Sequence, residues 1–248
     1  MSGIFGEHDE GVSMGAVSCR DKFTEVLMKN NGVECFGTTG DCALFDLELL
    51  FRKPVLPKKI NSIALSMPHI KEHWPMAYQL ALRLKEEFSC YVYLTFHGYH
   101  GKLSDHIDPE WTCEAIKVID LSGSYRRLSF YKHVDVHVGF RLHGHIWFLR
   151  HRKPSLLIAE DGRGLSHLYT VKGLGYSAAS KKVLKNADEI VEVDPKLIKE
   201  MREEAPSLQA VEMFKKEVKE GYPVTCRTLE EVDKLWVEKM KPFLESLP

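Results

Sequence analysis

Residues 134–145 have the sequence VDVHVGFRLHGH, which predicts a β-strand, a tight turn and the start of a helix. In open parallel sheets, ligands bind beyond the carboxyl ends of the strands, and free N–H groups at the start of the next helix attract anions there. A cation is unfavourable beside the positive end of a helix. Arg141 and His143 therefore indicate that an anion binds between them.

The two side chains have complementary chemistry. Arginine offers a planar fork of donors that fits a carboxylate or a phosphate. Histidine donates or accepts a proton near neutral pH. The alternative is that Arg141 pairs with a neighbouring acid and that His143 is a satisfied histidine of the interior, and the local pattern does not separate the two hypotheses.

The strand and helix pattern extends outward from this stretch. Apolar runs alternate with amphipathic segments over the first two thirds of the chain, which is typical of an α/β fold with a parallel sheet. Strands are predicted at residues 13–19, 33–36, 61–67, 90–96, 117–121, 134–140 and 155–159, with a further candidate at 189–193. Helices are predicted at residues 20–31, 75–88, 125–133 and 142–151, followed by Lys- and Glu-rich helices at 195–204, 207–220 and 229–247.

The composition is that of a globular protein without a nucleic-acid partner. The 248 residues suffice for one large α/β domain or two small ones, and the net charge of −1 gives no sign of a basic binding surface. A basic stretch at residues 150–153 is typical of a solvated helix end. No apolar run reaches the roughly 18 residues of a membrane helix, and the first residues lack the pattern of a secretion signal. The six cysteines form no C-x-x-C pair, which favours reduced thiols and a cytoplasmic location.

Two other strand ends carry candidate site residues. Arg20 opens a predicted helix with Asp21 as its cap, and the alternative is a surface ion pair. Glu160 and Asp161 follow the strand at 155–159, where a carboxylate holds a ribose hydroxyl or acts as a base. The alternative is a turn rich in Asp and Gly, because the G-R-G triplet that follows is too short for a phosphate loop.

Two further features are weaker. His133, Asp135 and His137 alternate, so they share one face of a strand and have a spacing that could suit a metal. Zinc needs three or four fixed ligands, and no metal site is predicted. The long polar loop at residues 97–108 is a candidate functional segment.

This chain has RDKFT at residues 20–24, GD at 40–41 and RLHG at 141–144. In this order, the motifs resemble the polysaccharide pyruvyl transferase family. That family has an R-D-x-x-T-like helix start, then a G-D turn, and much later a strand that runs into R-L-H-G. A helix, the strand sequence KPSLLI at 153–158 and LG at 174–175 follow in the family's order. The resemblance covers residues 13–180, and R-L-H-G is its most specific part.

The resemblance implies a fold like that of the B-type glycosyltransferases (GT-B), with a donor cleft between two Rossmann-like lobes. Family members move an enolpyruvyl-derived group from phosphoenolpyruvate onto a sugar and form a ketal. Carried over, Arg141 would hold the carboxylate or phosphate of the donor, together with Leu142 and Gly144 of the same motif, and Arg20 would help from the other lobe. His143 would protonate the methylene carbon of the donor, which creates an electrophilic centre for a sugar hydroxyl.

The chain departs from the family pattern in two places. The family carries more chain before the R-D helix, so we expect a reduced N-terminal lobe at residues 1–57, a donor-binding lobe at 58–194 and a helical segment at 195–248. Such a chain would be a truncated or a minimal member. The family also has a Y-D-x-K-like segment where this chain has AEDGR, residues 159–163. That segment is expected beside the donor, which makes Glu160 and Arg163 candidate donor contacts and Asp161 a candidate catalytic residue.

Three functions remain open. The first choice is transfer of a pyruvyl group from phosphoenolpyruvate to a hydroxyl of a saccharide acceptor, free or lipid-linked, without a cofactor. The second is a glycosyltransferase with a nucleotide-sugar donor, in which Arg141 and the helix start would neutralise the leaving diphosphate and Glu160 would contact the ribose. The third is a glycan- or nucleotide-binding module without catalysis. An oligomer formed through the helices after residue 195 is compatible with each of these.

Overall fold

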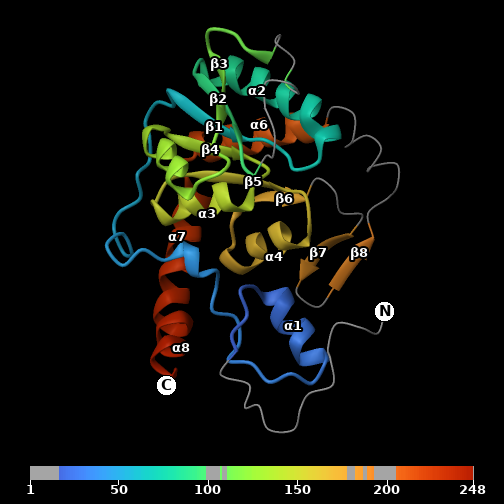
Figure 1. The fold of residues 1–248 in the computed structure, drawn as a ribbon, viewed down its shortest axis with the longest axis vertical. Coiled ribbons are helices and arrows are strands. Elements are labelled where there is room, and N and C mark those ends of the chain that lie inside the picture. The colour runs from blue at the N-terminus through green and yellow to red at the C-terminus, as the bar shows by residue number, and fades with distance from the viewer. Residues whose placement is uncertain are drawn as a thin grey trace.

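A six-stranded parallel sheet forms the centre of the molecule (Figure 1). The computed structural model describes residues 17–98, 107, 111–177, 182–186, 189–192 and 205–247. All neighbouring strands of this sheet run parallel in the order β3-β2-β1-β4-β5-β6, which is the strand order of the Rossmann fold. The predicted α/β fold is therefore confirmed. The strands are β1 (Ser62–Ser66), β2 (Tyr91–Phe96), β3 (Ile116–Asp120), β4 (Val136–Gly139), β5 (Ser155–Ala159) and β6 (Leu174–Ser177).

Helices cover both faces of the sheet, as its buried strands require. Ile63 and Leu65 of β1 pack into the core under α2 and α6, whereas Ala64 between them packs into the core under η5 and α3. This division follows from the alternation of side chains along a strand. The covering helices are α2 (Trp74–Phe88) and α6 (Ala205–Lys219) on one face, and the 3-10 helix η5 (Tyr125–His133) and α3 (Leu142–Arg150) on the other.

Helix α4 (Gly162–Val171) and strand β6 are absent from the predicted elements. Their glycines are the reason, because glycine ordinarily indicates a turn. Here the glycines permit close packing instead. A Cβ on Gly164 would lie 2.9 Å from the Cβ of Ala159, and one on Gly175 would lie 2.0 Å from a carbonyl oxygen of β5.

The candidate strand at 189–193 lies outside the main sheet. Strand β8 (Glu189–Glu192) pairs antiparallel with β7 (Lys182–Asn186) in a separate two-stranded sheet. The sixth strand of the main sheet is β6, which precedes both.

The strand predicted at 33–36 is wrong. This segment forms no strand; the chain pairs here through an isolated parallel bridge between Cys19 and Thr38 and a hydrogen bond from the N–H of Phe36 to the carbonyl oxygen of Val17 at 2.8 Å. Gly37, which separates residues 33–36 from Thr38, has a positive φ of 107°. The chain therefore bends directly before the bridge residue Thr38. Of the strand predicted at 13–19, residues 13–16 lie outside the described residues, and residues 17–19 contribute to this bridge and to the hydrogen bond with Phe36.

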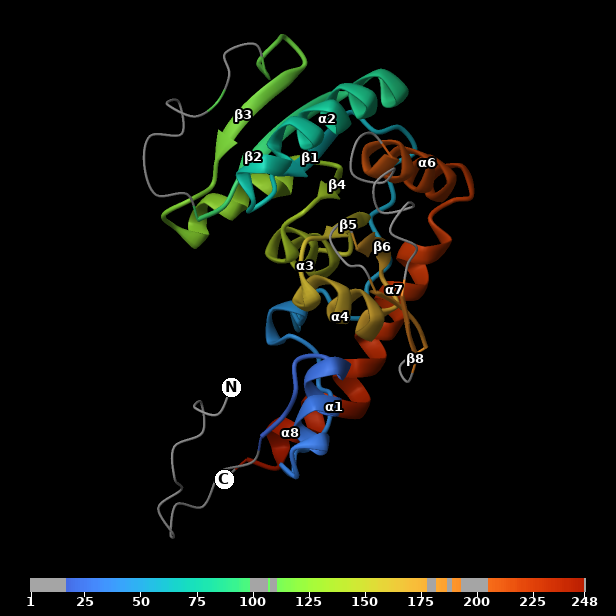
Figure 2. The ribbon, with the colours of Figure 1, turned by 90° about the vertical axis from the view of Figure 1, so that its right-hand side faces the viewer.

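The C-terminal helix connects the sheet to the N-terminal segment (Figure 2). Leu44 and Leu50 pack in one cluster with residues of α3, α4 and α7, and Phe36 contacts Phe243 with ring centroids 5.4 Å apart. The helix starts six residues before the predicted position 229, because Pro223 occupies its first turn. The helix predicted at 195–204 lies outside the described residues. The C-terminal elements are α7 (Pro223–Leu235), a π-helical turn η6 (Trp236–Met240) and α8 (Lys241–Glu245), and α1 (Lys22–Asn30) lies beside them.

Among the described helices, none combines the length and the uninterrupted apolar character that crossing a lipid bilayer requires.

Candidate functional site

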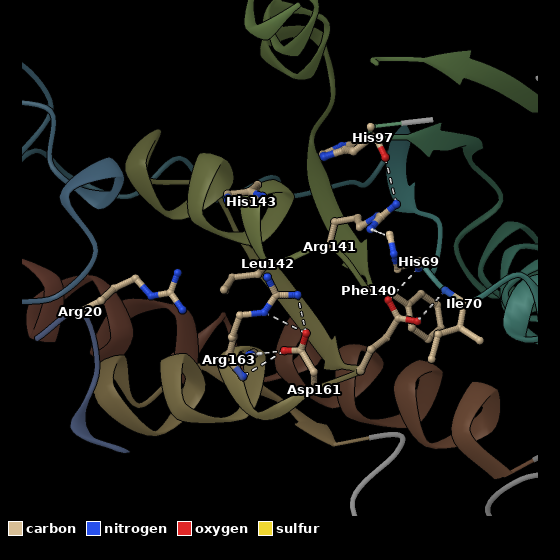
Figure 3. Close-up of a pocket in the computed structure, with 13 residues that line it drawn as sticks. Arg20, His69, Ile70, His97, Phe140, Arg141, Leu142, His143, Asp161 and Arg163 are labelled. Carbon is tan, nitrogen blue, oxygen red and sulfur yellow. Dashed lines mark hydrogen bonds and ion pairs between the residues drawn. The ribbon is translucent and has the colours of Figure 1, made fainter. Parts of the chain in front are cut away.

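A pocket of 460 Å³ opens at the carboxyl ends of β1, β4 and β5 (Figure 3). It lies between β1 and β4, where the strand order changes direction, and open α/β sheets bind their ligands at this point. Gly144 lies behind the pocket wall, where a Cβ would be 3.1 Å from Nε2 of His137. The other seven residues predicted for the site line the pocket: Arg20, Arg141, Leu142, His143, Glu160, Asp161 and Arg163.

Arg141 is held in place by backbone and side-chain contacts but keeps one free donor. Its backbone N–H donates to Oγ of Ser66 at 2.9 Å, and its guanidinium donates to Nδ1 of His69 at 3.0 Å and to the carbonyl oxygen of His97 at 2.9 Å. Its Nε is buried and has no hydrogen-bond partner among the described residues. Burial lowers the pKa of Arg141, and the negative charge of Glu160 partly opposes this shift. A buried donor without a partner is costly, so an external acceptor fits here.

Three helices begin at the pocket, and their first turns differ. Asp21 caps α1 by accepting from the N–H of Thr24 at 2.9 Å, and Asp161 caps α4. No side chain caps α3, which starts directly after Arg141. The N–H groups of its first turn are therefore left for an external acceptor, and the helix dipole favours a negative one.

His143 projects from the first turn of α3 into the solvent-accessible side of the pocket (Figure 3). In the described part of the chain its ring has no hydrogen-bond partner, in contrast to the interior position that was the alternative prediction. Its imidazole is therefore free to reach a bound ligand.

Arg20 and Arg163 bring two more guanidinium groups to the pocket, each with a carboxylate beside it. Arg20 reaches in from the side opposite to Arg141 (Figure 3) and lies 3.6 Å from Asp21 and 3.8 Å from Asp41. Arg163 lies 2.6 Å from Asp161. Three guanidinium groups and two carboxylates line the pocket, and the carboxylates of Asp21 and Asp41 stand beside Arg20 outside the lining.

The carboxylate of Asp161 is occupied by its own helix. It accepts hydrogen bonds from the N–H groups of Arg163 at 2.9 Å and Gly164 at 3.2 Å, in addition to its contact with the Arg163 side chain. Burial raises the pKa of Asp161, but the hydrogen bonds from Arg163 and Gly164 outweigh it and lower the pKa overall. A carboxylate held in its charged form in this way is a weak base.

Glu160 connects β5 to the loop that follows β1. Its two carboxylate oxygens accept from the N–H groups of His69 at 2.7 Å and Ile70 at 3.4 Å, and one lies 3.5 Å from Nδ1 of His73. The residue therefore positions the His69 backbone next to Arg141, a role that the sequence pattern does not reveal.

His97 and His69 belong to the pocket lining and are missing from the predicted site. His97 directly follows β2, so the rule that ligands bind at carboxyl strand ends would have found it. Nε2 of His97 lies 2.6 Å from the hydroxyl of Tyr131. Burial lowers the pKa of His97 to about 3, with Arg141 and His143 adding to the effect. His97 is therefore a neutral wall of the pocket whose carbonyl oxygen holds Arg141.

A chain of buried hydrogen bonds lies behind Arg141. Oγ of Ser66 lies 2.7 Å from Nε2 of His137, whose Nδ1 lies 2.8 Å from Oγ of Ser155, and this oxygen lies 2.6 Å from Nδ1 of His145. One set of directions that satisfies these pairs has Ser66 donating to His137, His137 donating to Ser155 and Ser155 donating to His145. Ser66, at the near end of the chain, accepts from the N–H of Arg141 and so anchors the turn that carries Arg141.

The alternating residues before Arg141 have separate tasks. Asp135 accepts from the N–H groups of Asn61 at 2.8 Å and Ser62 at 3.1 Å, whereas His137 is buried in the hydrogen-bond chain. Within the ranges that the structure describes, no three metal-ligating side chains come together.

Comparison with known proteins gives one family and several partial structural likenesses. The structure of TarM from S. aureus has a TM-score of 0.46 at 10% identity, covering 93% of this chain and 42% of that one. The OtsA apo structure has a TM-score of 0.43 at 10% identity, covering 77% and 45%, and the glycosyltransferase SnogD from Streptomyces nogalater has 0.35 at 15%, covering 85% and 60%. The chain thus spans less than two thirds of each of these structures. No curated protein sequence matches it.

The family match covers the pocket residues up to Asp161, whereas Arg163 and Gly164 lie just beyond it. The model of the polysaccharide pyruvyl transferase family matches residues 14–162, which is more than half of the chain. This span includes Arg20, the R-L-H-G turn at 141–144 and the carboxylates after β5. The chain belongs to the polysaccharide pyruvyl transferase family.

Proposed function

We propose that the protein transfers a pyruvyl group from phosphoenolpyruvate to a hydroxyl of a saccharide, with the donor bound in the pocket around Arg141. One observation carries this proposal: the uncapped first turn of α3 lies directly after an arginine whose buried Nε has no partner among the described residues. Phosphoenolpyruvate carries a phosphate and a carboxylate on adjacent sites, so it needs two sets of donors. The pocket offers Arg141 with the start of α3 on one side and Arg20 with Arg163 on the other.

His143 is the proposed acid. In the reaction, its protonated ring gives a proton to the methylene carbon of the donor, and positive charge develops at the neighbouring carbon. A sugar hydroxyl bonds to that carbon, and the bond to the phosphate oxygen breaks, so that inorganic phosphate leaves. A second hydroxyl of the sugar bonds to the same carbon and completes the ketal. One hydroxyl proton replaces the proton that His143 gave, and the other leaves with the phosphate.

The remaining predicted residues have supporting roles in this proposal. Asp161 caps α4 and orients Arg163 toward the donor, since its carboxylate already accepts from that residue. Glu160 positions the backbone beside Arg141 through the N–H groups of His69 and Ile70. Leu142 contributes an apolar wall. Neither carboxylate is proposed as the base.

The test begins with donor binding. Thermal stabilisation of the purified protein is measured with phosphoenolpyruvate and with UDP-, GDP- and dTDP-sugars, because a ligand at 100 times its Kd adds about 2.7 kcal/mol to the folded state. Hydrogen bonds to charged groups contribute about 1.5–3 kcal/mol each, so Arg141→Ala should raise the Kd for phosphoenolpyruvate roughly 10- to 150-fold. Arg150→Ala is the matched control, since Arg150 lies at the other end of α3 and pairs with Asp46.

Catalysis is tested by release of inorganic phosphate from phosphoenolpyruvate in the presence of methyl glycosides. His143→Gln should keep most of the donor affinity and lose phosphate release, because general acid catalysis contributes about 10²–10⁴-fold. A thermal shift with one nucleotide sugar and none with phosphoenolpyruvate would replace the proposal by a glycosyltransferase. Donor binding that falls equally in Arg141→Ala and His143→Gln, without turnover by the unmodified protein, would indicate a binding module.

A further inference from the structure

A second hollow of 270 Å³ lies directly beside the donor pocket, over the carboxyl ends of β2 and β3. His97, Gly98 and His143 line both spaces. The hollow therefore begins where the donor pocket ends, and the exposed ring of His143 stands at their boundary. None of the motifs that predict the donor site accounts for it.

Tyr125 is the most prominent side chain of this hollow. With 79% of its surface exposed, it is the most exposed large apolar or aromatic side chain in the described part of the chain. Its ring belongs to the first turn of η5, next to the hollow, and packs against no other ring in that part. An aromatic face with its electron-rich surface in water fits a ligand that is flat, partly apolar and bordered by hydroxyl groups.

Two serines line the hollow with Tyr125, and a carboxylate and a guanidinium lie next to them in the chain. Ser122 and Ser124 line the hollow, and Asp120 at the end of β3 accepts from the N–H of Ser122 at 2.9 Å. Arg127 lies 3.4 Å from the other oxygen of Asp120. Hydroxyl, carboxylate and guanidinium groups in this segment can both donate to and accept from sugar hydroxyl groups.

We infer that this hollow binds a pyranose ring of the saccharide acceptor, with Tyr125 stacked on the C–H face of the sugar. The inference rests on the proposed function, because it assigns the acceptor side of the same reaction centre. A sugar seated there has its hydroxyl groups facing His143 and the donor pocket. His143, which gives the proton, thus lies between the acceptor in this hollow and the donor in the neighbouring pocket.

Saturation-transfer NMR tests the assignment with methyl glycosides of glucose, galactose, mannose and N-acetylglucosamine on the full chain. Loss of an aromatic stacking contact corresponds to a Kd about tenfold higher, so Tyr125→Ala should abolish most of the saturation transfer. Tyr125→Phe keeps the ring and should keep the signal. Tyr91→Ala is the matched control, because Tyr91 is also an exposed tyrosine, at the opposite end of β2. UMP is included as a ligand whose base could also stack on the ring.

The outcomes separate this inference from the proposed donor. A methyl glycoside signal that depends on the Tyr125 ring and not on Tyr91 supports the inference, whether or not phosphoenolpyruvate stabilises the same sample. Stabilisation by phosphoenolpyruvate without any glycoside signal overturns the inference and leaves the donor proposal standing. A signal that is equal in Tyr125→Ala and Tyr91→Ala also overturns it, and so does UMP binding that requires Tyr125 when no glycoside binds.

Discussion

Replacing Ser66 by alanine tests whether the Ser66 hydroxyl positions Arg141. Ser66 is fully buried in β1, and its Oγ contacts the N–H of Arg141 at 2.9 Å and Nε2 of His137 at 2.7 Å. Ser66→Ala leaves both groups without this partner. Ser155→Ala is the matched control, because it removes the hydroxyl on the other side of His137 and has no contact with Arg141.

The expected loss of stability follows from the two orphaned groups. A buried donor or acceptor without a partner costs about 1–3 kcal/mol. Each variant leaves two such groups, which together cost about 2–6 kcal/mol. For a chain of this size, each kcal/mol lowers Tm by roughly 2–4 °C, so either variant should lower Tm by roughly 4–24 °C. Only Ser66→Ala releases the turn that holds Arg141. A loss of about 1 kcal/mol in its placement would weaken phosphoenolpyruvate binding about fivefold.

The assay measures both quantities on the same samples. Thermal unfolding followed by circular dichroism gives Tm, and a titration of Tm with phosphoenolpyruvate gives the relative Kd of each variant. We expect both variants to be less stable and only Ser66→Ala to bind more weakly. The reasoning would be refuted if Ser66→Ala kept the Tm of the unmodified protein, or if Ser155→Ala weakened binding as much as Ser66→Ala does.

Three further changes test the fold around the site. Asp233→Ala breaks the buried pair with Arg152, whose closest atoms are 2.7 Å apart, and should cost about 3–5 kcal/mol in urea unfolding; a loss below about 1 kcal/mol would contradict this. Gly139→Ala places a Cβ within 2.5–2.7 Å of three atoms of Ser66. It should cost at least about 1–3 kcal/mol or prevent folding, as measured by soluble yield and Tm. A normal Tm would show that β1 and β4 separate easily to admit the methyl group. Burial lowers the pKa of His137 to about 3, so the unfolded chain binds its proton first as pH falls below about 6.5. The contribution of His137 to the free energy of unfolding is complete above pH 6.5 and falls by about 1.4 kcal/mol per pH unit between pH 6.5 and 3. In His137→Gln, the free energy of unfolding measured in urea from pH 7.5 to 5 should therefore depend less on pH.

Much of the sheet could be predicted because its strands are short apolar runs between amphipathic helices. The elements around Val136–Gly139 and Leu142–Arg150 were predicted within two residues at each end. The two elements missed in the core, α4 and β6, have a common physical cause in glycine. Gly164 and Gly175 resemble turn residues in sequence, but each allows a helix or strand to lie against β5. Whether a glycine bends the chain or permits close packing depends on a neighbour far away in sequence.

The site was predictable where one local rule sufficed. Arg141 and His143 follow a strand and open a helix. This pattern alone predicted their place at the pocket, which both residues line. The contacts of Glu160 were not predictable, because its partners His69 and Ile70 are about 90 residues away in the chain. Asp161 shows the converse, since a carboxylate after a strand predicts either a base or a helix cap, and only its contacts with Arg163 and Gly164 identify the cap.

The three helix starts at the pocket support the proposal that the site binds an anion. An aspartate at the N-cap stabilises a helix by about 1 kcal/mol relative to a residue that cannot cap, and α1 and α4 have such aspartates at Asp21 and Asp161. At the same position of α3 the chain has Arg141, which does not cap and whose charge opposes the helix dipole. Folding alone would favour a capping side chain there. The chain itself provides no negative charge at the start of α3. A bound phosphate or carboxylate would supply that charge, and Arg141 would then add affinity for the ligand at the expense of the stability of the free protein.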